Sequence, residues 1–307
     1  MNDHKKKPIL VTGSHRSGST WAGVMLSAPP DIAYVNEPFN IEYKPGSCRP
    51  HFQYWYTYVC EENESAHVQY IRDCLRYKPH AIRKALQHGS LEDIPRLVRF
   101  QIQCLKARLM KKRPLVKDPL ALFSTEWMAE RFNMEVVILI RHPAAFVGSL
   151  KAAGWPFPFS HLLNQPLLMD RYLSGYAEEI EDFARHDRDL IDQAILLWNL
   201  IYSVVRTFQQ EHGADWLYVK HEDLSRDPVG EYRKLYEKLG IPFSDQARYR
   251  INKFSFAETE NKHMKRDSKS NIWKWKKRLT EGEISRVREK TGEVAGHFYT
   301  EDDWING

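Results

Sequence analysis

The sequence predicts an α/β fold in which a central parallel β-sheet is flanked by helices, and three observations support it. Short apolar, β-branched runs recur along the chain, as expected for strands buried on both faces. Segments with apolar residues at helical spacing separate these runs. The first run leads through a turn rich in glycine and serine into a helix-compatible segment. A chain of 307 residues can form one large α/β domain or two small ones, and because no linker or internal repeat divides it, we expect residues 1–307 to form a single domain.

The turn after the first run, residues 9–11, has the spacing of a phosphate-binding loop. Gly13 and Gly18 are separated by four residues, and Thr20 stands at the hydroxyl position. Such a loop, followed by a helix N-terminus, presents backbone N–H groups to an anion, so the fold is expected to be of the P-loop-containing nucleotide-binding type. However, Ser19 stands where a nucleotide triphosphatase has lysine, and the cation lies inside the loop, at Arg16. We therefore expect a bound phosphate-like group rather than the γ-phosphate of a triphosphate.

Two further predicted strands end in charged residues. The strand at residues 31–35 is followed by Glu37, and the strand at 114–117 ends in Lys117, with Asp118 and a proline next. Ligands of α/β folds bind at the carboxyl ends of parallel strands, so Glu37 and Lys117 are candidate site residues. A glutamate hydrogen-bonded within its loop near Arg16, and a surface lysine, remain the structural alternatives. Asp118 is suited to cap the helix that we expect to begin at the proline.

The clearest strand, residues 136–140, is followed at once by Arg141 and then by a helix that carries Ser149. One guanidinium and one hydroxyl at this place offer a site for a second phosphate. Taken alone, Arg141 is better explained by a pair with a carboxylate.

Later segments complete the predicted alternation. The last buried strand is expected at 216–219, and the final helix, 280–291, begins with a Thr280–Glu283 capping box. Further helices are expected at about 65–86, 94–110, 169–212 with a break near 186–187, and 228–239, which Gly240 closes.

Three segments have both a structural and a functional interpretation. The aromatic stretches 51–58 and 155–159 are either ordinary packed segments or walls of an acceptor pocket. The basic stretch 261–279, which holds two tryptophans, is expected to be a loop. It either folds over an anionic ligand or is an exposed loop whose tryptophans pack on the body of the protein.

Composition excludes several classes of protein. Charged residues make up 28% and hydrophobic residues 42%, and no apolar run is long enough to span a bilayer. The net charge of +5 comes from basic residues scattered among acids, which argues against a nucleic-acid surface. The charged N-terminus does not resemble a signal peptide, so a cytoplasmic location is expected. The four cysteines lack the spacing of zinc ligands, and we expect no metal; a Cys48–Cys60 bridge stays open.

Five of these motifs, in this order, resemble those of the sulfotransferases that use 3′-phosphoadenosine 5′-phosphosulfate (PAPS). The loop from Arg16 to Trp21 resembles the 5′-phosphosulfate loop of that family, and Arg141 with Ser149 has the spacing of its two 3′-phosphate ligands. Segments 117–119 and 221–224 resemble two further family motifs, and the basic stretch before Leu279 has the place of its cofactor-closing loop. The resemblance spans roughly residues 8–280 and implies the family's fold, with PAPS as co-substrate.

The resemblance also implies roles for individual residues. Arg16 and Lys117 would neutralise charge on the bridging and sulfuryl oxygens, and Glu37 would be the general base, with Asp118 as the reserve. Trp21 would stack near adenine, unless it is simply a core residue. The implied cofactor-binding residues are Ser14, His15, Arg16, Ser17, Gly18, Ser19, Thr20, Trp21, Arg141, Ser149, His221 and Ser270.

This sequence departs from the family pattern at three of these positions. Arg16 stands where cytosolic members have lysine, and His221 replaces the tyrosine that would contact adenine. Asp118 follows Lys117 where the small-molecule enzymes have a threonine and their histidine base, and for this reason Glu37 is the expected base.

The expected reaction is transfer of a sulfuryl group to a hydroxyl or amine of a small-molecule, carbohydrate or peptide acceptor. A P-loop small-molecule kinase and a catalytically inactive nucleotide-binding module are the alternatives. The acceptor and the oligomeric state stay open.

Overall fold

The computed structural model describes residues 7–42, 48, 50–78, 93–255 and 268–305. These residues divide into two compact units. The first unit comprises residues 1–12 and 19–137, and the second comprises residues 13–18 and 138–307. The loop of residues 13–18 thus belongs to the second unit, although strand β1 and helix α1 flank it in the chain.

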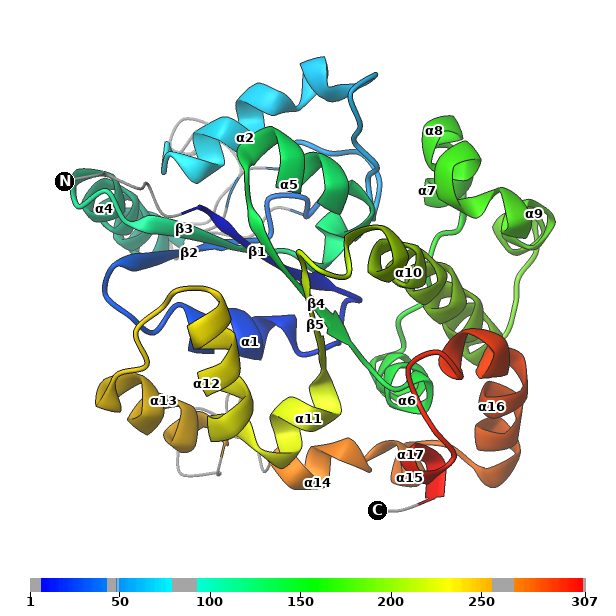
Figure 1. The fold of residues 1–307 in the computed structure, drawn as a ribbon. Coiled ribbons are helices and arrows are strands. Elements are labelled where there is room, and N and C mark those ends of the chain that lie inside the picture. Colours follow the sequence, from blue (N-terminus) through cyan, green and yellow to red (C-terminus); the bar gives the residue numbers. More distant parts are fainter. Residues whose placement is uncertain (1–6, 43–47, 49, 79–92, 256–267, 306–307) are drawn as a thin grey trace. The chain divides into compact units, whose positions relative to one another are not determined.

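Five strands form one sheet in the order β2-β3-β1-β4-β5 (Figure 1). β3 pairs with both β1 and β2 in parallel, with Ile9 opposite Leu115 and Val35 opposite Val116. The parallel sheet flanked by helices is therefore confirmed. The strands are β1 (Ile9–Gly13), β2 (Ile32–Asn36), β3 (Arg113–Lys117), β4 (Glu135–Ile140) and β5 (Leu217–Lys220).

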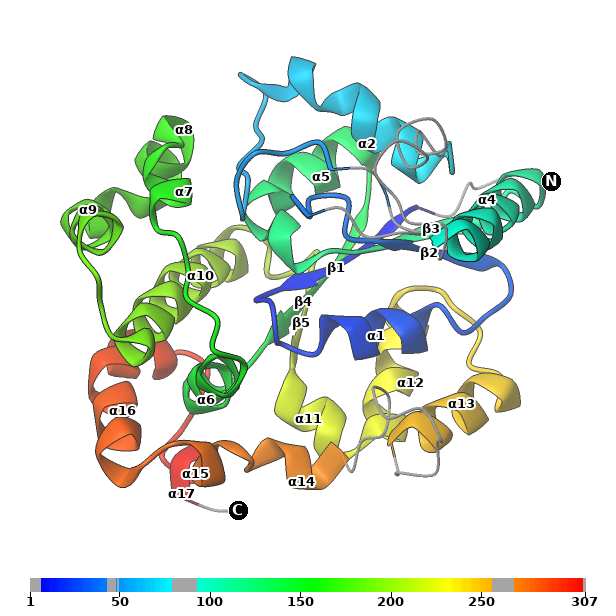
Figure 2. The same ribbon diagram turned by 180° about the vertical axis from the view of Figure 1, so that it is seen from behind.

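In the first unit, helices cover both faces of β1, β2 and β3. Figures 1 and 2 show α1 on one face and α2 with α5 on the other. Side chains of β1 and β3, among them Leu10, Val11 and Leu115, are completely buried between these layers, as the apolar runs predict. The helices of this unit are α1 (Ser19–Leu26), α2 (Val68–Leu75), α4 (Ile94–Leu109) and α5 (Thr125–Phe132), with 3₁₀ turns at Glu64–Ala66 and Pro119–Ser124.

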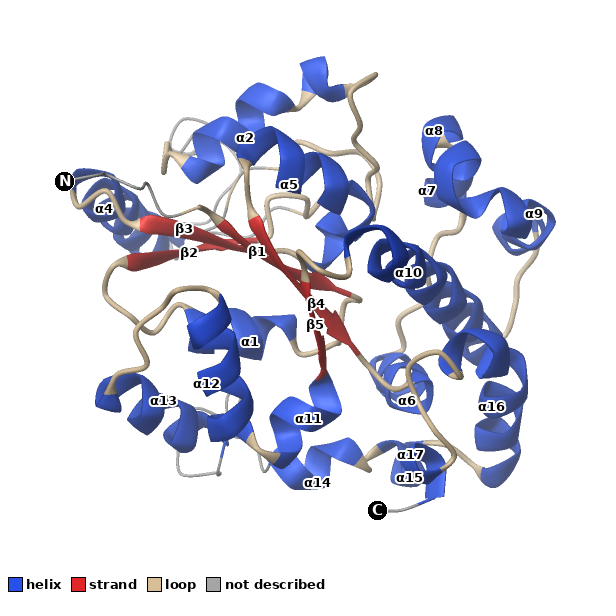
Figure 3. Ribbon diagram, viewed as in Figure 1, coloured by secondary structure: helices blue, strands red, loops and turns tan. Residues whose placement is uncertain are grey.

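The second unit is mainly helical (Figure 3), and its core is formed by α6, α10 and α16, which pack against one another. Its helices are α6 (Pro143–Ala153), α7 (Ser160–Leu163), α8 (Pro166–Leu168), α9 (Ala177–Arg185), α10 (Leu190–His212), α11 (His221–Arg226), α12 (Pro228–Lys238), α13 (Asp245–Ser255), α14 (Ser268–Ile272), α15 (Trp275–Arg278), α16 (Glu281–Ala295) and α17 (Asp302–Ile305). A π-helical turn at Met169–Leu173 and a 3₁₀ turn at Ser174–Tyr176 precede α9.

Several local predictions are confirmed by the hydrogen bonds that cap the helices. Thr280 accepts from the backbone N–H of Glu283, whose carboxylate accepts from the N–H of Thr280, so the predicted capping box is present. The break near residue 186 separates α9 from α10, and Gly240 after α12 has the left-handed φ of +60° that suits a C-terminal glycine.

Two predictions of secondary structure are wrong. The helix expected over 65–86 ends at Leu75, and residues 79–86 of that range lie outside the described residues. The basic stretch 261–279, expected as a loop, forms two short helices from Ser268 onward, and Trp275 at 3% exposure is a core residue. The helical pattern was not recognisable in the sequence, because only Ile272, Trp275 and Leu279 on these turns are buried and charged residues fill most of the other positions.

Two predictions concern organisation. Neither Cys48 nor Cys60 forms a disulfide, so the bridge between them that the sequence left open is absent. The assignment of residues 1–307 to a single domain stays a prediction. No helix among the described residues is long and apolar enough to cross a lipid bilayer.

Candidate anion-binding site

The loop after β1 owes its shape to two glycines that allow close backbone approach. Gly13 has φ +135°, and a Cβ there would lie 2.4 Å from the carbonyl oxygen of Leu139. Gly18 has φ +92°, and a Cβ there would lie 2.5 Å from Nδ1 of His221. Both conformations strain any residue with a side chain. The Gly13–Gly18 spacing recognised in the sequence therefore reflects two steric requirements within the second unit.

The loop presents polar groups suited to an anion. The N–H of Ser17 donates to the carbonyl of Ser14 at 3.2 Å, which closes the turn. The Ser17 side chain is completely buried, and its hydroxyl has no hydrogen-bond partner among the described residues. A buried hydroxyl of this kind costs free energy unless a ligand satisfies it. An oxygen of a phosphate group would do so, and this observation fits the nucleotide ligand expected for the loop.

Arg16, in the middle of the loop, is directed to the helix that follows β4. Its φ is +63°, in the left-handed region, and its Nε donates to Oγ of Ser149 at 2.9 Å. Its guanidinium also lies over the ring of Trp155, 5.1 Å from the ring centre. The structure thus brings together two residues that the sequence assigned to different phosphates.

Arg141 extends this cluster from the end of β4. One of its guanidinium nitrogens donates to the carbonyl oxygen of Arg16, so the cation holds the loop backbone. Arg141 also lowers the pKa of Glu222, although burial is the larger effect and raises that pKa overall. Arg141 therefore has both a carboxylate neighbour, Glu222, and a contact with the loop.

Helix α10 fixes the backbone of Arg141 from two sides. The hydroxyl of Tyr202 accepts from the N–H of Arg141 at 2.9 Å and lies 2.9 Å from Oγ of Ser14. Nε1 of Trp198 donates to the carbonyl of Arg141, also at 2.9 Å. Sequence reasoning missed both residues. Their i, i+4 spacing was a signal that they share a helix face, but it did not show which backbone groups they meet.

The segment around α15 places a third arginine, Arg278, near Arg16. A Cβ at Gly148 of α6 would lie 3.4–3.5 Å from side-chain atoms of Leu279, Trp275 and Arg278, so the segment around α15 packs closely on the helix that carries Ser149. Burial lowers the pKa of Arg16, and the positive charge of Arg278 lowers it further. Arg278 was not singled out from the sequence, because the basic stretch holds many cations of equal appearance.

Three more predicted cofactor residues lie in the second unit. His221 begins α11, is 2% exposed and lies against Gly18, so it forms part of the wall of the loop. His15 is half-buried with its ring edge against Phe146, and burial and then Arg16 lower its pKa to about 4. Ser270 is exposed on α14, which packs against α11.

In the first unit, Lys117 and Glu37 form an ion pair at the ends of β3 and β2. Lys117 is 2% exposed, and its Nζ donates to Oε1 of Glu37. The other carboxylate oxygen accepts from the side-chain amide of Asn40 at 2.8 Å, and the N–H of Glu37 donates to the carbonyl of Lys117 at 2.9 Å. Lys117 is therefore a buried residue rather than a surface lysine. Glu37, with φ +44°, is held by hydrogen bonds on both carboxylate oxygens.

A glycine on α1 makes room for this pair. A Cβ at Gly23 would lie 3.0 Å from Cβ and Cγ of Lys117 and 2.8 Å from the ring of Tyr34. The stem of the lysine therefore runs under the helix at a position where a larger residue would displace it. The sequence gave no reason to single out Gly23.

Asp118 serves mainly as a backbone anchor. Its carboxylate accepts from Leu120 at 2.9 Å, which caps the 3₁₀ turn as predicted, and from Phe39 at 2.6 Å. The residue is completely buried, and burial raises its pKa to about 7.

The remaining predicted residues of the loop lie on α1, in the first unit. Ser19, at 4% exposure, is buried and Thr20 is exposed, and together they open the helix. Trp21 is 6% exposed, as expected for the core residue that was the alternative to adenine stacking.

The two aromatic stretches differ in exposure. His51 stacks on Tyr70 at 4.3 Å and Phe52 stacks on Phe39 at 4.1 Å, so the first stretch is largely a packed segment. In the second stretch Phe159 is buried, whereas Trp155 is 51% exposed beside Arg16.

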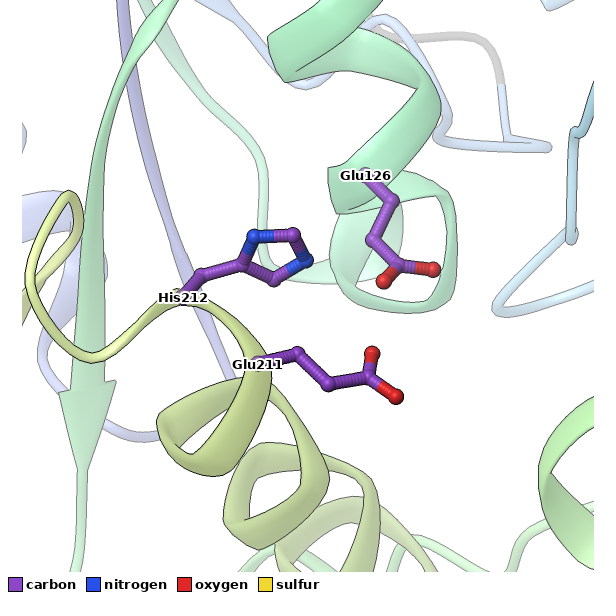
Figure 4. A group of neighbouring side chains, drawn as sticks. All are labelled: Glu126, Glu211 and His212. Carbon is purple, nitrogen blue, oxygen red and sulfur yellow. The ribbon is translucent and has the colours of Figure 1, made fainter.

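Figure 4 draws three side chains of the kind that bind metals: Glu126 on α5 of the first unit, and Glu211 and His212 on α10 of the second. Each of the two on α10 has a partner of its own. Glu211 pairs with Arg171 at 3.2 Å, and His212 stacks on Trp216 at 4.2 Å. These contacts explain both side chains without an ion, so we assign no metal to them.

Comparison with known proteins identifies a family. A model described as the sulfotransferase family matches residues 8–245 of this chain. No curated protein gives a significant match.

Three solved sulfotransferase structures resemble this chain only distantly. Sulfotransferase STF1 from Mycobacterium tuberculosis is 16% identical, with a TM-score of 0.47, over 94% of this chain and 77% of that one. The sulfotransferase domain of the curacin biosynthetic pathway is 14% identical, with a TM-score of 0.47, over 93% and 97%. Mouse sulfotransferase SULT7A1 in complex with PAP is 13% identical, with a TM-score of 0.44, over 94% and 84%. At these values, the assignment to a family rests on the family model.

Replacing Tyr202 by Phe tests the support of the loop. The change leaves the N–H of Arg141 and the hydroxyl of Ser14 without their shared partner, so we expect a loss of about 2 kcal/mol in the free energy of unfolding. Urea denaturation measures this loss. Tyr249→Phe, at a position 66% exposed, is the control and should change nothing. Equal stability of the two variants would contradict the role given to Tyr202.

The burial of His142, the residue next to Arg141, makes the stability of the fold depend on pH. Both of its ring nitrogens are buried and lack a hydrogen-bond partner in the described structure, and burial lowers its pKa from 6.5 to about 3. As the pH falls from 6.5 towards 3, the unfolded chain takes up a proton that the folded chain does not. Each pH unit in this range therefore removes about 1.4 kcal/mol of stability through this residue.

His142→Phe preserves a ring against Trp275 and should make the decline of stability below pH 6.5 shallower by that amount. Chemical denaturation at a series of pH values measures the slope. His297→Phe, at an exposed position, is the matched control. An unchanged slope in His142→Phe would show that His142 is not the titrating group.

Proposed function

Because the chain belongs to the sulfotransferase family, and is therefore a sulfuryl-transferring enzyme, we propose that its donor is PAPS and that the Gly13–Gly18 loop with Arg141 and Ser149 binds it. The observation that carries this proposal is the convergence of Arg16, Arg141 and Ser149 beside a loop whose Ser17 hydroxyl is buried and unsatisfied. These groups are donors of hydrogen bonds, two of them cations, as a ligand with phosphate groups requires.

The donor has two anionic parts, and the second unit offers ligands for both. The Ser17 hydroxyl and the backbone N–H groups of the loop suit the 5′-phosphate. Arg141, Ser149 and Arg278 suit the 3′-phosphate, since α15 packs on the helix that carries Ser149. Arg16 donates to Ser149, so we assign it a contact with the 3′-phosphate in addition to the neutralising role expected from the sequence.

The ion pair between Glu37 and Lys117 bears on how Glu37 would act as the base. In the proposed reaction, an acceptor hydroxyl gives its proton to a Glu37 oxygen while its own oxygen bonds to sulfur, and the bond between sulfur and the 5′-phosphate oxygen breaks. The ammonium of Lys117 beside Glu37 favours the ionised carboxylate that this step needs. Lys117 and Glu37 are assigned to the transfer on their sequence positions and on their pairing within the first unit.

The finer assignments stay proposals. The reaction would need no metal, because the arginines supply the positive charge that a divalent ion supplies to phosphoryl transfer. The acceptor is a small molecule, a carbohydrate or a peptide, nucleic acid is not a partner, and the location is cytoplasmic. A small-molecule kinase is the less favoured alternative, since Ser19 replaces the lysine of its loop.

Binding of adenosine 3′,5′-diphosphate (PAP) tests the donor site. We expect titration calorimetry to show binding of this product and much weaker binding of ATP. Ser149→Ala and Arg141→Ala should each weaken it about tenfold to a hundredfold, because each removes a hydrogen bond to a charged group. Ser203→Ala, another helical serine, is the control, since its hydroxyl donates to the carbonyl of Leu200 and contacts Tyr176, neither of which belongs to the proposed site. Tighter binding of ATP than of PAP would favour the kinase.

Glu37→Gln tests the base. The substitution is isosteric, so we expect the affinity for PAP to be unchanged while kcat with PAPS and a responsive acceptor falls by at least about a hundredfold. The acid limb of the pH profile of kcat/KM should disappear with it. Glu42→Gln, an exposed carboxylate of the same segment, is the control and should retain full activity. A Glu37→Gln enzyme with normal kcat would exclude this base, and a wild-type protein that binds PAP without turnover on a broad acceptor panel would favour an inactive module.

A further inference from the structure

Helix α4 exposes a stripe of aliphatic side chains, defined here as Ile94, Val98, Ile102, Leu105 and Leu109. Their exposed fractions are 38%, 50%, 47%, 47% and 71%, respectively. Spacings of three and four residues place all five within an arc of about 80° on one face of the helix. A different face, with Leu97, Cys104 and Ala107, is buried in the first unit. The helix therefore has a second apolar face beyond the one that it needs for folding.

Cations border this aliphatic stripe on both sides. By helical position, Arg99 and Lys106 flank one edge and Arg108 flanks the other, and all three are exposed. In residues 93–112, six lysines and arginines accompany a single carboxylate, Asp93, which lies 3.9 Å from Arg96. An apolar stripe between two rows of cations needs an occupant that is apolar in the middle and anionic at the edges.

A second copy of this chain is a poor occupant. Pairing of two such helices through the stripe would bring the basic borders of each copy against those of the other, and like charges at close range are repulsive. The stripe also lacks the tryptophan, tyrosine and arginine side chains that dominate specific protein interfaces. Figures 1 and 2 show helix α4 at the margin of the first unit, and the stripe carries only aliphatic groups.

We propose that α4 binds the surface of a bilayer that contains anionic phospholipid. The helix would lie in the plane of the interface, with the aliphatic stripe between the acyl chains and the bordering cations at the phosphates. The long stems of lysine and arginine suit this geometry, because they cover apolar surface while the charge remains among the headgroups. This peripheral contact needs no membrane-spanning helix, and it is independent of the proposed donor site.

Vesicle flotation with the full-length protein tests the proposal. We expect binding to vesicles of phosphatidylcholine mixed with phosphatidylserine to be at least about tenfold stronger than to phosphatidylcholine alone, and to weaken with added salt. Leu105→Gln/Leu109→Gln removes apolar area, and Arg99→Glu/Lys106→Glu reverses the charge of one border. Each double variant should reduce binding to the mixed vesicles at least about tenfold.

Matched controls lie in the second unit. Ile305→Gln replaces an isoleucine that is 61% exposed, and Lys238→Glu/Arg248→Glu reverses two exposed charges; both should bind vesicles like the wild type. Melting temperature and PAP affinity should be unchanged in all variants, which separates this test from that of the donor site.

Three results would overturn the proposal. The first is equal binding to the two kinds of vesicle, and the second is no binding to either, which would leave the stripe to a protein partner. The third is a dimer in light scattering that Leu105→Gln/Leu109→Gln converts to a monomer, because the stripe would then be an interface between copies.

Discussion

The hydroxyl of Tyr202 is the contact on which the arrangement of the second unit's site depends. It joins the Ser14 side chain of the loop to the backbone N–H of Arg141 at the end of β4. Arg141 in turn donates from its guanidinium to the carbonyl of Arg16, so the loop is attached at two points. Because α10 carries Tyr202 and packs against α6 and α16, the position of the loop is set by the core of this unit. A flexible loop would lose conformational entropy when it binds a ligand, whereas the contacts of this loop already order it in the fold.

The same arrangement concentrates positive charge. Arg16 and Arg141 meet at the loop, and Arg278 is near enough to lower the pKa of Arg16. Like charges close together repel one another, although Arg141 also interacts with the buried Glu222. An anion bound among the three would remove the remaining repulsion and gain charge-assisted hydrogen bonds as well. Positive charge gathered in this way favours an anionic ligand group over a neutral one.

The sequence predicted most of the sheet, because the strands are short buried runs whose composition differs from that of their surroundings. It also singled out Arg16, Arg141 and Ser149 by their spacing after strand ends, and hydrogen bonds join these three residues, while their role in binding stays a prediction. It missed Tyr202, Trp198 and Gly23. Each acts through close contacts with residues distant in the chain, and such contacts leave no periodic signal. It also failed where charge concealed structure, as in α15, where a single tryptophan holds a strongly basic turn in the core.

Asp118 accepts hydrogen bonds from the backbone N–H groups of Phe39 and Leu120. Protonation of this one carboxyl therefore affects how the segment that carries Glu37 is attached. Burial raises the pKa of this carboxyl from its ordinary value near 3.8 to about 7. The ionised form accepts from Phe39 and Leu120 with full charge on both oxygens, whereas the acid form places a hydrogen on one of them and weakens that bond. The attachment of Phe39 to this carboxyl is therefore expected to weaken as the pH falls and Asp118 takes up its proton.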